Sequence, residues 1–179
     1  MKKYSFIAVL VAFVFFGSSA VAFAASDYFL KLDGIEGEST SKGHAKEIDI
    51  QSWSWGMSNS GSSGTGGGGG AGKVSFSDIS FMKSVDKSSP ALFKACATGK
   101  HIDKATLTVR NSDGQDYLHY QLENVLCTSL QQSGGGDAPT ESLSLNYEKF
   151  KIEYQQPTRK GLGEMLSAGW DIVRNIIWE

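Results

Sequence analysis

Short segments in which apolar and polar residues alternate strictly recur along most of the chain. In residues 104–110, Ala105, Leu107 and Val109 alternate with polar side chains, and residues 27–32 and 118–123 repeat the pattern. A period of two places the apolar side chains on one face of a strand and the polar ones on the other. The sequence therefore predicts a mainly antiparallel all-β fold built from half-buried strands.

Two of the apolar runs change parity partway along. Ile48 and Ile50 lie on one parity and Trp53 on the other, and a similar change separates Leu145 from Phe150. A parity change turns the apolar set to the opposite face. The first run is therefore either a strand covered on both faces or one with a bulge near Gln51 and Ser52, and the second run implies a bulge or bend. Such bends are typical of a sheet that curls into a barrel.

One segment is predicted to be helical. Ser89 suits the N-cap, Pro90 the first helical position and Gly99 the C-terminal cap. Between them, Leu92, Phe93, Cys96 and Ala97 are expected to form one apolar face that packs on a sheet.

The first 24 residues have the features of a secretory signal. Lys2 and Lys3 precede an uninterrupted apolar run over residues 6–16, and small residues lead to Ala24. We expect cleavage between Ala24 and Ala25, or two residues earlier; the first leaves a mature domain of residues 25–179 in a secreted or periplasmic location. The alternatives are a membrane anchor, for which the apolar run is too short, and a misassigned start codon.

The mature chain is mildly acidic. Removal of the leader, with its two lysines, leaves 15 basic and 19 acidic side chains. This balance argues against a nucleic-acid partner, and no later stretch is apolar enough to suggest a membrane contact after signal removal.

Residues 58–72 are almost entirely Ser and Gly and contain no apolar anchor. Ordering each residue costs about 1–2 kcal/mol of backbone entropy, so contacts outside an isolated subunit must order this loop. The segment matches the P-loop spacing from Gly67 to Lys73, but Val74 stands where such a loop needs Ser or Thr. We therefore exclude a phosphate-binding role.

Nothing in the sequence assembles a catalytic centre. The three histidines His44, His101 and His119 are scattered, no metal-binding spacing occurs, and no Gly-x-Ser-x-Gly motif is present. Trp53 and Trp55 could stack on a sugar or base, but aromatic residues at period two more often serve a core or an interface. We expect a protein that is not an enzyme and needs no cofactor.

The chain has two cysteines, Cys96 and Cys127, which lie 31 positions apart. Export would permit a disulfide, and closing a loop of this length stabilises by about 3–4 kcal/mol. Two buried free thiols are the commoner outcome for cysteines in apolar segments, and both alternatives stay open.

Several ordered segments resemble the Hcp (haemolysin-coregulated protein) family of type VI secretion systems over about residues 27–156. They include His44-Ala-Lys-Glu47, Ser52-Trp53-Ser54-Trp55-Gly56-Met57-Ser58, the run from Gly66 to Lys73, and Asp86-Lys-Ser88-Ser-Pro90. His44, Glu47, Trp53 and Trp55 carry the family motif.

The resemblance implies two curled antiparallel sheets that form a β-barrel with one flanking α-helix. It also implies homohexameric rings that stack into the inner tube of an injection apparatus and carry effectors. The partners are then other copies of the chain and the spike, sheath and effector proteins. The implied subunit interface loop contains these residues: Gly56, Ser58, Gly64, Gly66, Gly70, Gly72 and Lys73.

The signal peptide departs from the family pattern, since Hcp proteins normally start in the cytoplasm and leave through the apparatus. An alternative function is therefore an exported periplasmic or surface binding module that uses the Hcp fold outside any injection apparatus. The C-terminal segment 157–179 fits either an amphipathic helix or a strand, and we favour a strand over residues 169–175.

Overall fold

The computed structural model describes residues 26–60, 74–136 and 138–179. The predicted signal peptide, with Ala24 and Ala25, lies outside the described residues. The described residues form twelve strands and one helix. In chain order these are β1 Asp27–Leu32, β2 Ile48–Ile50, β3 Ser52–Ser54, β4 Met57–Asn59, β5 Val74–Phe76, β6 Ile79–Ser84, α1 Ser89–Thr98, β7 Ile102–Arg110, β8 Asp116–Ser133, β9 Thr140–Asn146, β10 Lys149–Thr158, β11 Gly161–Asp171 and β12 Ile176–Ile177.

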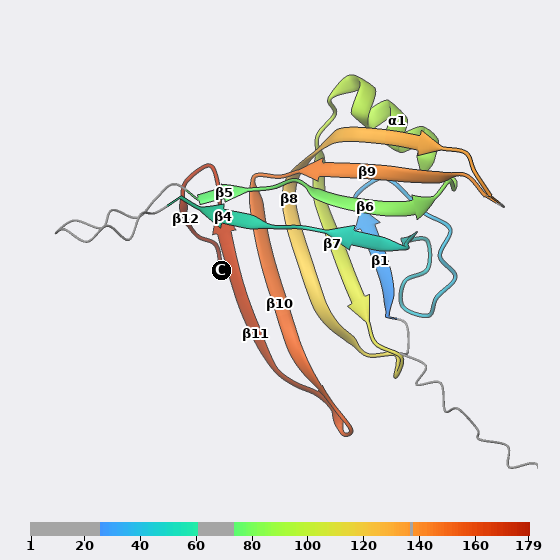
Figure 1. The fold of residues 1–179 in the computed structure, drawn as a ribbon. Coiled ribbons are helices and arrows are strands. Elements are labelled where there is room, and N and C mark those ends of the chain that lie inside the picture. Colours follow the sequence, from blue (N-terminus) through green and yellow to red (C-terminus); the bar gives the residue numbers. More distant parts are fainter. Residues whose placement is uncertain (1–25, 61–73, 137) are drawn as a thin grey trace, which may run out of the picture.

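Two antiparallel sheets share the 18-residue strand β8 (Figure 1). The long sheet has the order β12-β11-β10-β8-β7-β1-β2, and the short sheet has the order β3-β6-β9-β8. The first half of β8, up to Val125, pairs with β7 and β10, whereas the segment from Leu126 onward pairs with β9. The register shifts between Cys127 and Ser129, and β8 leaves one sheet to enter the other near this irregularity.

The predicted closed β-barrel is wrong, because the sheets remain open at one side. Strand β2 ends the long sheet by pairing with β1, and β3 ends the short sheet by pairing with β6. These two strands follow each other along the chain around Gln51, whose backbone nitrogen donates to the Met82 carbonyl oxygen of β6 at 2.8 Å. The path of paired strands ends at β2 and at β12, and these two strands do not pair with each other in the part of the chain that the structure describes. The predicted parity change at this point is the passage of the chain from one sheet to the other.

The second predicted parity change has the same cause. Strand β9 pairs with the end of β8 in the short sheet, and β10 pairs with the start of β8 in the long sheet. The chain crosses between the sheets at Tyr147 and Glu148, so the apolar parity must change there. At both positions the change of parity marks the point where the chain passes from one sheet to the other.

The core lies between the facing sides of the two sheets. The long sheet contributes Leu107 and Leu122, and the short sheet contributes Phe81, Leu143 and Leu145, each at most 1% exposed. Burying a side chain of this size stabilises a fold by about 1.5–3 kcal/mol. These contacts fix the mutual position of the sheets and of the loops they carry.

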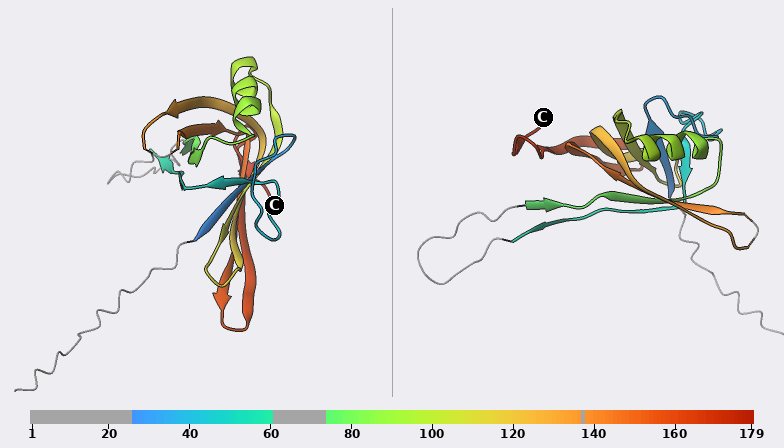
Figure 2. Two further views of the ribbon diagram at one scale, coloured as in Figure 1. Left: turned by 90° about the vertical axis from the view of Figure 1, so that its right-hand side faces the viewer. Right: turned by 90° about the horizontal axis from the view of Figure 1, so that it is seen from above.

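Helix α1 lies against β8 at one end of the molecule (Figure 2). The helix begins at Ser89 with Ser88 as its N-cap, one residue earlier than expected, and Gly99 closes it at φ 63° as predicted. Leu92 and Ala95 are its buried apolar residues. Phe93, expected on the buried face, is 66% exposed.

The C-terminal segment is a strand and not a helix. Strand β11 pairs with β10 along residues 161–171, a turn follows, and β12 folds back onto the end of β11. The predicted strand over 169–175 is therefore correct for its first half only. Asn175 adopts a φ of 56°, which reverses the chain in the second half.

Candidate functional site

Strands β4 and β5, which flank the Gly-rich segment in the sequence, form a two-stranded ladder that projects from the body of the molecule (Figures 1 and 2). Its pairs are Met57–Phe76, Ser58–Ser75 and Asn59–Val74. Of the predicted interface loop, Gly56 and Ser58 belong to this hairpin root. The remaining predicted loop residues lie outside the described residues: Gly64, Gly66, Gly70, Gly72 and Lys73.

An aromatic cluster fixes the root of the hairpin to both sheets. The Trp55 ring stacks on Phe150 of β10 at a centroid distance of 4.1 Å and an interplanar angle of 8°. Its indole Nε1 donates to the hydroxyl of Tyr147, which in turn donates to the Ser77 carbonyl oxygen at 2.9 Å. The rings of Trp53 and of Tyr120 on β8 also pack together, with their centroids 4.8 Å apart. The expectation of a core or interface role for the two tryptophans agrees with these contacts.

The hydroxyl at the centre of this cluster is held in its neutral form. Burial, reinforced by the charge of Asp78, raises the pKa of Tyr147 to about 12 despite the Trp55 hydrogen bond. The Tyr147 hydroxyl therefore remains protonated, and able to donate to the Ser77 carbonyl oxygen, at a higher pH than the hydroxyl of an exposed tyrosine.

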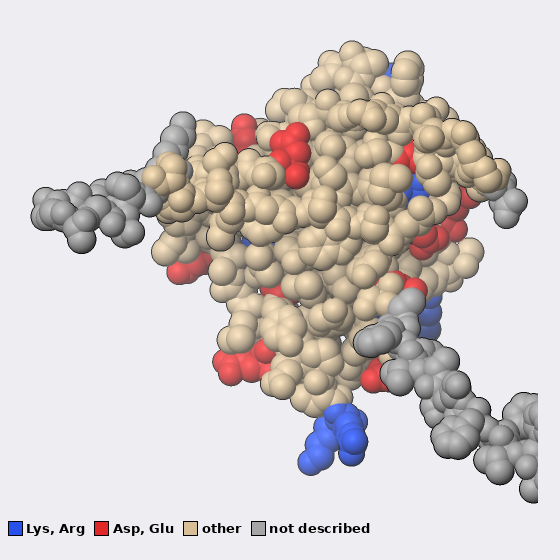
Figure 3. All heavy atoms as spheres, viewed as in Figure 1, with Lys and Arg blue, Asp and Glu red and all other residues tan. Residues whose placement is uncertain are grey.

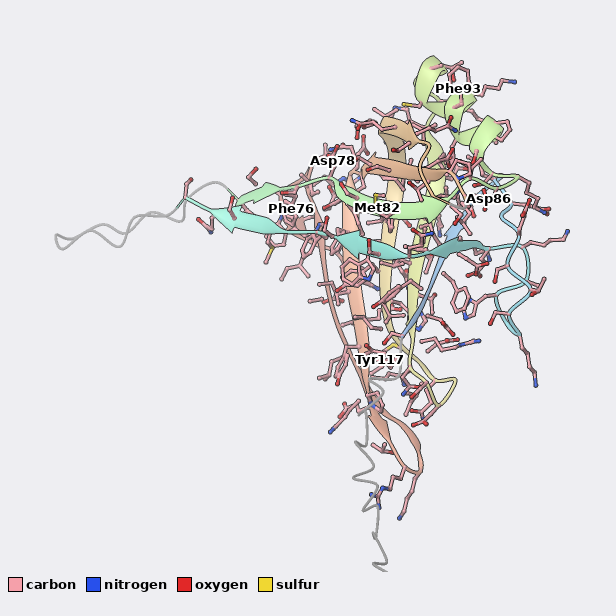
Figure 4. All side chains as sticks on the ribbon, turned by 45° about the vertical axis from the view of Figure 1, so that its right-hand side comes forward. Phe76, Asp78, Met82, Asp86, Phe93 and Tyr117 are labelled. Atoms are coloured by element: carbon pink, nitrogen blue, oxygen red, sulfur yellow. The ribbon has the colours of Figure 1, made fainter. Side chains whose placement is uncertain are left out.

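An apolar groove of about 270 Å³ opens beside the hairpin root. Its walls come from the hairpin and from the β10–β11 ladder, with these lining residues: Trp55, Met57, Val74, Phe76, Phe150, Ile152, Ala168, Gly169 and Trp170. Figure 4 shows Phe76 on the hairpin, away from α1 and its Phe93. A groove with so little polar lining is suited to apolar side chains rather than to a charged ligand.

The groove continues into an exposed strip of the long sheet. In the β10–β11 ladder Ile152 pairs with Ala168 and Tyr154 pairs with Leu166, so these side chains follow the groove along one face. Tyr154 is 37% and Leu166 is 62% exposed. We call this strip, formed by Ile152, Tyr154, Leu166, Ala168 and Trp170, the apolar face.

The apolar face is exposed because the two sheets differ in length. The β10–β11 hairpin extends well past the strands of the short sheet (Figure 1), so its far part has no strand packed on it. Charged side chains are sparse over much of the face seen in Figure 3, and basic ones gather at the tip of this hairpin, where Arg159 and Lys160 form the turn.

The other two family-motif residues, His44 and Glu47, form a separate cluster that fastens the loop between β1 and β2. The ring of His44 stacks on the ring of Phe29, and the two centroids are 4.1 Å apart. Its Nδ1 lies 2.8 Å from a Glu47 carboxylate oxygen, and its Nε2 lies 3.1 Å from an Asp116 carboxylate oxygen. Arg110 donates to Asp116 from both Nε, at 2.6 Å, and a terminal nitrogen, at 3.0 Å. Burial alone would raise the pKa of Asp116, but Arg110 and His44 hold it below its usual range.

A buried ion pair beneath α1 was missed by the sequence reasoning. Lys83 and Glu141 are both fully buried and lie 2.8 Å apart, and Lys83 also donates to Asp86 at 2.8 Å. Ser89, the first residue of α1, donates to Glu141 at 2.8 Å. The sequence does indicate that Lys83 is buried, because it lies on the same side of its strand as Ile79 and Phe81.

Cys96 lies on α1 and Cys127 on β8, two elements that contact each other. Both are free thiols, with Cys127 buried and Cys96 half-buried. Burial, together with the adjacent Cys96 thiol, raises the pKa of Cys127 to about 12.

Within the described ranges, no group of three or more His, Cys, Asp or Glu side chains is arranged to hold a metal ion. The same residues include no helix that is long and apolar enough to cross a membrane. The groove and the apolar face are the parts of the described surface that can bind another apolar surface.

Comparisons with known proteins point in one direction. A family model described as "Type VI secretion system effector, Hcp" matches residues 29–154. Protein hcp1 of Pseudomonas aeruginosa is 47% identical over 159 residues, which cover 85% of this chain and 98% of that protein. The crystal structure of Hcp1 from Salmonella typhimurium, at 35% identity, has a TM-score of 0.73 and covers 86% of this chain and 99% of its own. A type VI secretion system effector from Yersinia pestis, at 31% identity, has a TM-score of 0.67 and covers 81% and 99%.

Proposed function

The chain belongs to the Hcp family of type VI secretion system proteins, and we propose that its mature form assembles into six-membered rings. The rings stack into a tube that carries or accompanies secreted effectors. The protein acts by self-association and not by catalysis, and its other partners are the spike, sheath and effector proteins of the apparatus.

The observation that carries this proposal is the apolar face together with the groove at its upper end. Leu166 and Met57 are more than 60% exposed, although both belong to well-formed strands. A contiguous exposed apolar surface on a soluble chain marks a site of association. A second copy of the chain is the occupant that a ring requires, because each subunit then covers its neighbour.

The Gly-rich loop, including Gly56 and Ser58 at its root, has a complementary role in the proposal. The aromatic cluster around Trp55 fixes the direction of the β4–β5 hairpin, and the hairpin projects from the body (Figure 2). Beyond its root the loop contains no apolar residue larger than Ala71, so a neighbouring subunit or ring would provide the contacts that order it.

The leader belongs to the same proposal. Cleavage after Ala24 would deliver a chain that begins at Ala25 to a secreted or periplasmic location. N-terminal sequencing of the protein recovered outside the cytoplasm tests this step. A chain that begins at Met1 would contradict the cleavage and restore the family's usual route through the apparatus.

Two matched substitutions test assembly through the apolar face. Leu166 on β11 is 62% exposed and Phe93 on α1 is 66% exposed, so Lys at either position should leave the fold of the subunit intact. We expect the mature chain and its Phe93→Lys variant to sediment as hexamers and to show rings by electron microscopy. Leu166→Lys should sediment mainly as smaller species. A monomeric wild type without rings would contradict the proposal and favour the exported binding module.

Replacing residues 61–72 with a short Gly-Ser linker tests the loop separately. Its root at β4–β5 would remain, and so would the apolar face. We expect rings to persist and stacking of rings to be lost, as judged by the length of tubes in micrographs. Undiminished stacking would contradict the proposed role of the loop.

A further inference from the structure

His44 is a buried histidine that faces a carboxylate on each side. Its Nδ1 lies 2.8 Å from an oxygen of Glu47, in the loop between β1 and β2, and its Nε2 lies 3.1 Å from an oxygen of Asp116, the first residue of β8. The imidazole is also stacked on the ring of Phe29 in β1. These contacts hold the ring in one orientation, in which both nitrogens point at acidic groups.

The chemistry of the two partners fixes the protonation state of the ring. An ionised carboxylate only accepts hydrogen bonds, whereas a neutral imidazole has one donor and one acceptor nitrogen. A neutral His44 could therefore donate to only one of its partners, and the lone pair of its other nitrogen would face a carboxylate oxygen. Only the imidazolium form donates to Glu47 and Asp116 together.

The other charged groups around the ring favour the same form. Arg110 of β7 donates to both oxygens of Asp116, at 2.6 and 3.0 Å. Asp27 of β1 adds a third acidic group, whose charge acts on Arg110 together with that of Glu47. The cluster thus contains three acids and one permanent cation, and a protonated His44 supplies the second cation.

The contact joins a loop of unfavourable backbone geometry to the corner where β7 and β8 meet. Arg110 makes a parallel contact, because its terminal nitrogen donates to the Ser41 hydroxyl at 3.1 Å. The backbone near His44 is left-handed at two positions, with φ of 90° at Gly43 and 69° at Lys46. The Cβ of Lys46 makes this conformation unfavourable, so contacts with the rest of the subunit must keep the loop in shape.

We infer that His44 is a proton-operated latch for the loop of residues 33–47. While the ring is an imidazolium, it joins Glu47 of the loop to Asp116 of β8. As pH rises through the titration of His44, the ring gives one proton to water, one of the two hydrogen bonds is lost, and three acids remain beside one cation. Because the folded state binds this proton, the stabilisation is present at low pH and is lost as pH rises. The latch is a property of a single subunit and does not depend on assembly.

Hydrogen–deuterium exchange of the mature chain, residues 25–179, at about pH 6 and about pH 9 measures the latch. After correction for the intrinsic effect of pH on exchange, we expect the amides of residues 37–47 to lose at least about tenfold in protection, as for the loss of one charge-assisted hydrogen bond. The amides of β9 should show no change. An NMR titration of the ring, with its signal assigned by its absence in His44→Gln, should show the change from imidazolium to neutral imidazole over the same range.

Glu47→Gln separates the charge from the contact. A side-chain amide can donate to Nδ1 while Nε2 donates to Asp116, so a neutral ring then satisfies both partners and the pH response should vanish. Glu36→Gln is the matched control, because Glu36 lies in the same loop but pairs with Lys46. This variant should keep the response of the wild type.

Three results would overturn the inference. One is a ring that is already neutral at about pH 6. Another is equal protection of the loop at the two pH values, and the third is a pH response that Glu47→Gln retains. Because the first two measurements use the wild-type chain, they decide the matter even if a variant fails to fold.

Discussion

Lys83 and Glu141 show how a single pair of residues can hold an element in place. Their side chains are fully buried, 2.8 Å apart, and they connect β6, β9 and the start of α1. Removing one partner from a buried pair leaves an uncompensated charge, which costs about 3–5 kcal/mol. The pair therefore makes each of its members intolerant of single substitution.

We predict that Lys83→Met lowers the free energy of unfolding by about 3–5 kcal/mol, because Glu141 then stays buried without its cation. The double variant Lys83→Met, Glu141→Leu should recover most of this loss. Urea unfolding at one fixed protein concentration measures both. A single variant that is as stable as the double one would contradict the account.

The same pair predicts a response to acid. Burial by itself would raise the pKa of Glu141, but hydrogen bonds from Lys83, Gln132 and Ser89 hold it below its usual value. A carboxyl group with a lowered folded-state pKa stabilises the fold above its unfolded pKa, and this contribution is lost as pH falls through the folded value. Between about pH 7 and about pH 3 the wild type should therefore lose more stability than Glu141→Gln. Equal losses in urea unfolding would count against this role.

The position of each charge in the alternation of its strand indicates that Lys83 and Glu141 are buried, but this becomes clear only when the two strands are considered together. Lys83 continues the apolar parity of Ile79 and Phe81, and Glu141 continues that of Leu143 and Leu145. Each charge alone is consistent with a strand end at the surface. The register pairs Lys83 directly with Glu141, and register between distant strands cannot be read from either strand by itself.

At the scale of elements, the alternation predicted the strands and the two points where the chain changes sheet. It did not predict that the sheets stay open. A parity change shows that a strand bends, but whether two edges then pair depends on their lengths and positions in space. In the described part of the chain the path of paired strands ends at β2 and at β12, which have three and two residues and do not pair with each other.

The predicted helix shows a similar limit. Its caps were placed within one residue because Pro90 and Gly99 act through local backbone geometry. Its buried face was only partly correct, since Phe93 is exposed and Ala95 is buried. Helical spacing defines a stripe of residues, but the sheet on which the helix packs decides which side of that stripe is covered.

Gly37 and Gly56 differ in the space that is available for a side chain, and this difference allows a prediction with its own control. A Cβ at Gly37 would lie 2.3 Å from the Glu47 carbonyl oxygen and 2.5 Å from the Ile48 Cα, whereas one at Gly56 would meet nothing within 4 Å. We expect Gly37→Ala to destabilise the subunit by about 1–3 kcal/mol, because backbone atoms must move apart. Gly56→Ala should change stability little. Thermal unfolding of both variants measures the difference, and similar Tm values would contradict the close approach at Gly37.

At the scale of the whole molecule, the shape is set by β8, which belongs to two sheets of unequal length. Because β8 spans both, the sheets are joined at a fixed angle, and the β10–β11 hairpin extends beyond the core (Figure 1). The apolar face follows from this geometry. The residues on it have ordinary strand alternation, and this pattern does not indicate that part of the face lacks a covering sheet.

This geometry predicts how assembly responds to salt. The apolar face contains no charged side chain among its five residues, so ring formation through it should rely on burial of apolar surface. Added salt screens ion pairs between exposed charges but does not weaken apolar association. We expect the fraction of hexamer to stay constant or rise from about 0.1 M to about 1 M sodium chloride, as measured by sedimentation velocity. Dissociation of rings at high salt would instead point to an interface built from charge pairs, such as one around Arg159 and Lys160.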